Sequence, residues 1–117
     1  MHLVMMALLG AAMVAASAAS AASAALAASA AAADDRGQRL YASCAGCHGT
    51  AGGGSGNSGE ILPVLAGQPK DALAASMRAF RTGERPATIM QQLAKGYTDE
   101  QIGLIAAYLA AQPGPAR

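Results

Sequence analysis

The sequence has few aromatic residues and little charge. Its 117 residues include one Phe, three Tyr and no Trp, and charged residues make up 13%. The net charge of +1 argues against binding of nucleic acids through charge. Every charged residue lies within residues 34–117. A folded part of this size with so few aromatic residues needs a covalent cross-link, a metal or a cofactor to complete its core.

The first 33 residues contain no Asp, Glu, Lys or Arg. Residues 3–16 have the length and apolar character of the hydrophobic part of a secretory signal, and an Ala/Ser tract with many small-residue cleavage sites follows. We predict that residues 1–33 are a signal peptide and that residues 34–117 form an exported, periplasmic domain. The alternative is a retained membrane anchor, since the tract is long enough to span a bilayer. Ala and Ser favour the signal peptide, although only His2 stands where Lys or Arg is usual.

One segment of the mature region has the periodicity of an amphipathic helix that begins near Pro69. Leu73, Met77 and Phe80 fall on one face of this helix. Gly83 is a typical residue at a helix C-terminus. We therefore expect a helix from Pro69 to Gly83, followed by a loop over residues 82–97.

The last helix is predicted to begin at Thr98. Thr98 and Gln101 have the spacing of a capping box, and the Pro-Gly-Pro run at residues 113–115 would end the helix. Its buried stripe is expected to consist of Ile102, Ile105, Ala106 and Leu109.

A short helix is expected to open the mature region, because the acidic pair Asp34 and Asp35 suits a helix N-terminus. The sequence shows no alternation with a period of two, so no strand is predicted. Residues 46–67 hold eight of the fourteen glycines and should form a long loop. The predicted fold is all-α, with about three helices and long loops of the kind that wrap a bound group.

Cys44, Cys47 and His48 form the motif C-x-x-C-H, and they are the only cysteines and the only histidine outside residues 1–33. Two cysteines three positions apart lie on one helical turn, so both sulfurs can reach the two vinyl groups of one porphyrin edge. The following histidine then lies under the ring, where it can bind the iron. This pattern is typical of covalently attached haem c.

Three other interpretations of the motif fit the sequence less well. A zinc site requires four ligands, whereas the mature region offers three crowded ones. A thioredoxin-like redox pair requires a βαβ context, which the sequence lacks. A disulfide between Cys44 and Cys47 would close a very small loop and stabilise the fold little. The sequence therefore favours one haem c.

The sixth ligand of the iron is expected to be a methionine. Met77 and Met90 are the two methionines of the mature region. Met77 falls on the apolar stripe, where core packing is its ordinary role, whereas Met90 lies in the expected loop 82–97. We favour Met90, and ligation by His and Met suits electron transfer. Five-coordinate iron with an open site is the alternative.

These motifs resemble the class I c-type cytochromes over nearly all of residues 36–112. The matching segments are CAGCH, PVLAGQ, FRTGER, ATIM and YTDEQIGLIAAYLAAQ. Within the family, ERPATIMQQLAKGYTDEQI is most similar to the cytochrome subunit of flavocytochrome c sulfide dehydrogenase, and small dihaem cytochromes are also similar. The resemblance implies a class I cytochrome c fold around one covalent haem. Residues 52–59 are richer in glycine than the family pattern.

The resemblance also implies roles for individual residues. Cys44 and Cys47 would form the thioethers, His48 would be the proximal ligand and Met90 the distal ligand. The carbonyl of Pro63 would accept a hydrogen bond from the His48 ring, although Pro63 is equally well explained as a residue that stiffens a loop. Gly37 and Tyr41 would pack where the first helix crosses the last, near Tyr108.

A basic cluster on the predicted helix is formed by Lys70, Arg78, Arg81 and Arg85. A solvated helix face is the ordinary explanation, and a docking patch or a partner for haem propionates is the functional one. Three functions remain open. The first is one-electron transfer, with electrons accepted from an FAD flavoprotein subunit in sulfide oxidation. The others are a free-standing carrier to an oxidase, and a haem enzyme or gas sensor with an open distal site. In the first two the protein is a carrier and not itself a catalyst.

Overall fold

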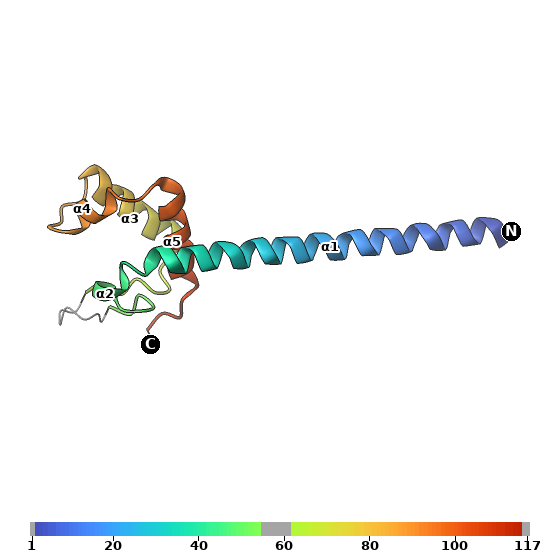
Figure 1. Ribbon diagram of the computed structural model, residues 1–117, viewed down its shortest axis with the longest axis horizontal. Helices are drawn as coiled ribbons and strands as arrows, with labels where there is room; N and C mark the ends of the chain where they lie inside the picture. The colour runs from blue at the N-terminus through green and yellow to red at the C-terminus, as the bar shows by residue number, and fades with distance from the viewer. Residues whose placement is uncertain (1, 55–61, 116–117) are drawn as a thin grey trace. The chain divides into compact units, whose positions relative to one another are not determined.

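The computed structural model describes the backbone of residues 2–54 and 62–115, and the side chains of those residues from position 19 onward. Within these residues the chain is all-α, as predicted, and no strand occurs. Figure 1 shows the helices. They are α1 (His2–Tyr41), α2 (Ala45–His48), α3 (Lys70–Thr82), α4 (Met90–Ala94) and α5 (Asp99–Ala111). The predicted helices correspond to α1, α3 and α5, whereas α2 and α4 are short helices within expected loops.

The chain divides into two units, Met1–Ala32 and Ala33–Arg117. Removal of residues 1–33 as a signal peptide remains a prediction. Helix α1 begins at His2, so Asp34 and Asp35 lie inside a helix rather than at its start. The expected start was wrong because the preceding residues are mostly Ala, which has the highest intrinsic helix propensity. Among the described residues, no helix combines the length and apolarity needed to cross a bilayer.

The ends of α3 and α5 follow from their sequences. Pro69 precedes the first residue of α3, and Gly83 ends the helix with a φ of 84°, which favours glycine. At the start of α5, the hydroxyl of Thr98 accepts the amide of Gln101 at 3.2 Å. The Gln101 side chain accepts the amide of Thr98 at 2.9 Å, so the predicted capping box is confirmed.

The core of the second unit lies between α1, α3 and α5. Met77 packs against this core from α3, which agrees with its predicted packing role. The four residues of the predicted α5 stripe are all buried, as expected. The buried cluster consists of Tyr41, Leu73, Ala74, Ile102, Ile105, Ala106, Tyr108 and Leu109. It contains only two aromatic rings, so the shortage of rings in the sequence is also a property of the core.

Helix α1 crosses α5 at Gly37, as the family resemblance implied. A Cβ atom at Gly37 would lie 2.5 Å from the carbonyl oxygen of Leu104 and 2.9 Å from Cβ of Tyr108. Only glycine lets the two backbones approach this closely. The rings of Tyr41 and Tyr108 pack together beside the crossing, with centroids 5.7 Å apart.

Within the second unit, α3 and α4 lie side by side, and α2 lies below them in the view of Figure 1. Helix α2 ends the C-x-x-C-H motif, and Met90 is the first residue of α4. The fold therefore carries the two predicted parts of the iron site on different helices.

Candidate functional site

The C-x-x-C-H motif forms a single helical turn. The amide of Cys47 donates to the carbonyl of Cys44 at 3.2 Å, and the amide of His48 donates to the same carbonyl at 2.9 Å. Both cysteines are free; Cys44 is half-buried and Cys47 is exposed. The turn therefore holds both sulfurs on neighbouring positions and places His48 directly after them, which is the arrangement that attachment of a porphyrin edge requires.

Cys44 is surrounded by hydroxyl groups from two parts of the chain. Its sulfur lies 3.9 Å from the hydroxyl of Ser43, which in turn lies 2.6 Å from the hydroxyl of Tyr97. Burial raises the pKa of the Cys44 thiol, and the hydrogen bonds of Ser43 and Tyr97 oppose this shift. Sequence reasoning missed Ser43 and Tyr97, because 54 positions separate them and neither belongs to a motif.

The ring of His48 faces the carbonyl of Pro63. Nδ1 of His48 lies 3.4 Å from this oxygen, a distance at the long end for a hydrogen bond. A proton on Nδ1 leaves Nε2 with its lone pair, which is the form in which a histidine binds a metal. The structure thus brings together the two residues that the resemblance had paired.

Met90 and Met77 occupy different environments. Met90 begins α4 and is half-buried, next to the exposed Ile89, so it lies in a short helix rather than in a plain loop. Met77 packs against the buried cluster of α3 and α5. Of the two sulfurs, that of Met90 is therefore the one not engaged by the core.

The residues around Met90 fit a flat apolar group. Ile89 and Leu93 are the two large apolar side chains of the second unit that are strongly exposed among the described residues, at 63% and 51%. Met90 and Leu93 are three positions apart on one side of α4, and Ile89 directly precedes this helix. A haem held at Cys44 and Cys47 would cover apolar surface of this kind, and Met90 supplies a thioether sulfur there. The donor set of His nitrogen and Met sulfur suits haem iron.

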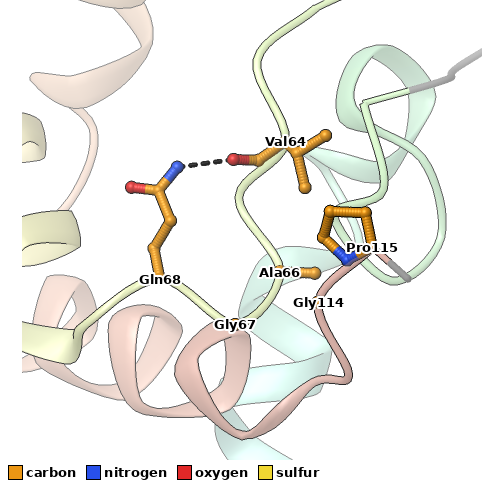
Figure 2. Close-up of a pocket in the computed structure, with 6 residues that line it drawn as sticks. All are labelled: Val64, Ala66, Gly67, Gln68, Gly114 and Pro115. Atoms are coloured by element: carbon orange, nitrogen blue, oxygen red, sulfur yellow. Dashed lines mark hydrogen bonds between the residues drawn. The ribbon is translucent and has the colours of Figure 1, made fainter. Parts of the chain in front are cut away.

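The other features of the described residues do not include any of the predicted site residues. No group of three or more His, Cys, Asp or Glu side chains that could hold a metal ion occurs in the described part of the chain. A cavity of about 270 Å³ lies between residues 64–68 and the C-terminal residues Gly114 and Pro115 (Figure 2). It is lined by none of the predicted site residues, and it is smaller than a typical small-molecule site of roughly 300–1,000 Å³.

Two of the arginines in the predicted basic cluster are paired with a carboxylate. Arg78 and Arg81 both bond the same oxygen of Asp99, at 2.9 and 2.8 Å. These hydrogen bonds hold the pKa of Asp99 below its usual value. Arg81 also donates to the carbonyl of Tyr97 at 3.1 Å. The two arginines therefore join α3 to the start of α5, which neither a solvated helix face nor a docking patch had predicted.

Arg85, the third arginine of the cluster, lies apart from this pairing. Its guanidinium carbon is 4.7 Å from the centroid of the Phe80 ring, and the group donates to the hydroxyl of Ser76 at 3.2 Å. The guanidinium keeps its charge at the surface.

Comparison with known proteins identifies the family. The cytochrome c family model matches residues 35–112. The chain belongs to the cytochrome c family. The match supports a class I c-type cytochrome, and the fold agrees with it. This cytochrome carries one covalently attached haem c, for which Cys44 and Cys47 have the required spacing, and it transfers electrons through that haem.

Two curated relatives are similar to parts of the chain. The cytochrome subunit of sulfide dehydrogenase from Chlorobaculum tepidum is 38% identical over 48 residues, which are 41% of this chain and 44% of the relative. Cytochrome c-554(548) from Halomonas halodenitrificans is 42% identical over 55 residues, or 44% of this chain and 66% of the relative. The chain therefore matches less than two thirds of the length of either relative.

Proposed function

We propose that this cytochrome is an exported, periplasmic one-electron carrier that accepts electrons from a flavoprotein subunit in sulfide oxidation. The turn from Cys44 to His48, with the His48 ring against the Pro63 carbonyl, is the observation that carries the role of a redox carrier. The similarity to a sulfide dehydrogenase cytochrome subunit supports the choice of partner.

Each site residue has a distinct task in this proposal. Cys44 and Cys47 would hold the haem through two thioethers, and Nε2 of His48 would bind the iron. The Pro63 carbonyl would keep the proton of His48 on Nδ1 and so fix the ring. Met90 would be the second ligand of the iron, and the exposed side chains of Ile89 and Leu93 would help to exclude water there. The bound haem supplies a reversible one-electron couple.

The assignment of Met90 is tested by comparing two methionine variants. In the ferric protein, the weak red-region band of Met–iron ligation should disappear in Met90→Ala and persist in Met77→Ala. Met77→Ala should instead lower stability, since Met77 packs against the core. Loss of the band in Met77→Ala alone would reverse the assignment. Rapid binding of carbon monoxide by the reduced wild type would indicate an open site and a haem enzyme or gas sensor.

The partner is tested by purification and by reduction. Expression with its own leader in the native host should yield the cytochrome together with an FAD-containing subunit. That complex, but not the isolated cytochrome, should reduce its haem rapidly when sulfide is added. A cytochrome that purifies alone and is oxidised by a terminal oxidase would instead be a free-standing carrier.

Export is tested by the intact mass of the haem-stained chain. A mature protein that begins near residue 34 and carries the mass of one haem would support the signal peptide. A haem protein that retains residues 1–33 in a membrane fraction would show an anchor instead.

A further inference from the structure

Three hydrogen bonds and the peptide bond between Leu62 and Pro63 form a closed ring at His48. The amide of Gly54 donates to the carbonyl of His48 at 2.9 Å, and the amide of Leu62 donates to the carbonyl of Gly54 at 3.0 Å. Leu62 precedes Pro63, whose carbonyl faces Nδ1 of His48 at 3.4 Å. The ring therefore runs from the His48 backbone through Gly54 and Leu62 to Pro63, and returns to the His48 side chain.

Gly54 is the closest point of approach in this ring. Its φ is +85°, a conformation that residues with a Cβ rarely adopt. A Cβ at Gly54 would lie 2.6 Å from the carbonyl oxygen of Leu62 and 3.1 Å from Cγ2 of Val64. The nearer atom belongs to the backbone, so it cannot give way as the end of a flexible side chain would. Any larger residue must displace the segment that carries Pro63.

Gly52 supports the same segment at a different place. Its carbonyl accepts the amides of Leu65 and Ala66 at 2.8 and 3.0 Å, beyond Pro63 in the chain. Its φ is +77°, and a Cβ there would lie 2.7 Å from Cδ2 of Leu109, which is the end of a flexible side chain. Gly52 therefore has a φ as unfavourable for a side chain as that of Gly54, but it is not part of the ring.

We propose that Gly54 is a positioning residue that tunes the haem iron, because it fixes the Pro63 carbonyl against Nδ1 of His48. This inference rests on the proposed ligation of the iron by His48. A histidine that donates its Nδ1 proton to a carbonyl is a more basic ligand, and a more basic ligand favours the ferric state. The ring of hydrogen bonds through Gly54 therefore keeps the reduction potential lower than it would be if Nδ1 of His48 had no hydrogen bond. Hydrogen bonding to an axial ligand is one of the ways in which proteins tune haem.

Three alanine variants of the exported haem protein test the proposal. Gly54→Ala should raise the reduction potential and shift the Nδ1 proton resonance of His48 upfield, because its hydrogen bond weakens. Gly52→Ala, which is matched for backbone strain, should lose stability but move both readouts much less. Gly53→Ala should behave as the wild type, since a Cβ at Gly53 meets nothing within 4 Å and its φ is not positive.

Two results would overturn the proposal. One is a Nδ1 proton resonance that stays in place in a folded Gly54→Ala protein. The other is an equal shift of potential in Gly52→Ala and Gly54→Ala, which would mean that general loosening of the loop is responsible.

A measurement on the wild type covers the case in which Gly54→Ala does not fold. The amides of Gly54 and Leu62 should exchange with solvent more slowly than the amide of Gly53, because only the first two close the ring. Exchange of all three at the same rate would reject the ring.

The experiment also separates this proposal from the proposed function. Nitrogen-15 labelling of histidine in the wild type shows whether the His48 ring carries the large shifts of an iron ligand. If it does not, the proposed function fails whatever the glycine variants do. If His48 is shifted and the variants do not behave as expected, only the role of Gly54 is rejected.

Discussion

Two regions of the second unit are held together in different ways. The helix core of α1, α3 and α5 is held by eight buried side chains. The segment 42–68, which we call the haem-side segment, carries the motif and Pro63. Its buried residues in the described range are glycines and Ala66, and it is linked mainly by backbone hydrogen bonds. Side-chain packing therefore stabilises one region, whereas the other depends on close backbone contacts and on the covalent haem.

Tyr41 joins the two regions. Its ring packs against Tyr108 in the helix core, and its hydroxyl donates to the carbonyl of Gly49 in the haem-side segment at 2.7 Å. Only 1% of its surface is exposed. We therefore expect substitutions in the helix core, in the haem-side segment and at Tyr41, which joins the two, to lower the stability by different amounts.

The largest effect is expected from removal of both attachment points. A Cys44→Ala/Cys47→Ala protein should be colourless and should lose its cooperative unfolding transition, because Ala66 is the only buried residue with a side chain among the described residues of the haem-side segment. Haem staining on a denaturing gel and thermal melting followed by circular dichroism measure both effects. The total stability of a small domain, about 5–15 kcal/mol, sets the scale of the loss.

The control for this change is Gly46→Ala, in the same turn. A Cβ at Gly46 meets nothing within 4 Å, so this variant should keep its haem and its transition. A double cysteine variant that melts as cooperatively as the wild type would mean that the haem-side segment is stable without the haem.

The second-largest loss of stability is expected from a substitution in the helix core. Ile102 is fully buried, and Ile102→Ala should lower the free energy of unfolding by about 2–5 kcal/mol. The reduction potential should change little, because Ile102 is not part of the haem-side segment. Urea unfolding of the haem protein and a redox titration measure the two quantities.

Gly103→Ala, one position further along α5, is the matched control. A Cβ at Gly103 meets nothing within 4 Å, so alanine should stabilise the helix by roughly 0.5–1 kcal/mol. A large change in the reduction potential of Ile102→Ala, together with its loss of stability, would show that the two regions are not energetically distinct.

The smallest effect is expected at the joint, and it depends on pH. Burial raises the pKa of Tyr41 to about 12, from 10.0. Because the folded protein favours the neutral phenol, its stabilisation is fully present below pH 10 and is lost as the pH rises towards 12. Tyr41→Phe should cost about 1 kcal/mol at neutral pH and should remove this alkaline loss.

Urea unfolding at neutral pH and between pH 10 and 12 measures this difference. Tyr97→Phe is the control, since it removes a hydroxyl of the Ser43 pair but leaves Tyr41 in place, and it should keep the alkaline loss. An unchanged alkaline loss in Tyr41→Phe would assign that loss to another group.

Much of the helix core was predictable from the sequence. The α5 stripe, the capping box at Thr98 and the stop at Gly83 depend on residues within a few positions of one another. Local patterns of this kind specify helix ends and helix faces whatever the rest of the fold does. The predicted start of α1 was wrong because the local signal there is weak: an acidic pair does not mark a helix start when a long run of Ala precedes it.

The site was predictable in its chemistry but not in its supports. The C-x-x-C-H motif at residues 44–48 predicted haem c as the cofactor, and the apolar face of α3 predicted Met77 as a core residue. The pairing of Asp99 with Arg78 and Arg81 was not foreseen, and neither was the contact of Ser43 with Tyr97. In each case the partners come from different segments and share no spacing in the sequence.

The sequence alone determined that this chain is helical and that it binds a covalent haem, because helix periodicity and the attachment motif are encoded within single turns. Only the tertiary structure decided which glycines matter. Gly53 lies between Gly52 and Gly54 in the chain, yet of these three glycines it is the only one at which a Cβ meets no other atom within 4 Å. The difference arises because residues 62–66 return to lie against the backbone at Gly52 and Gly54, and no local pattern specifies that return.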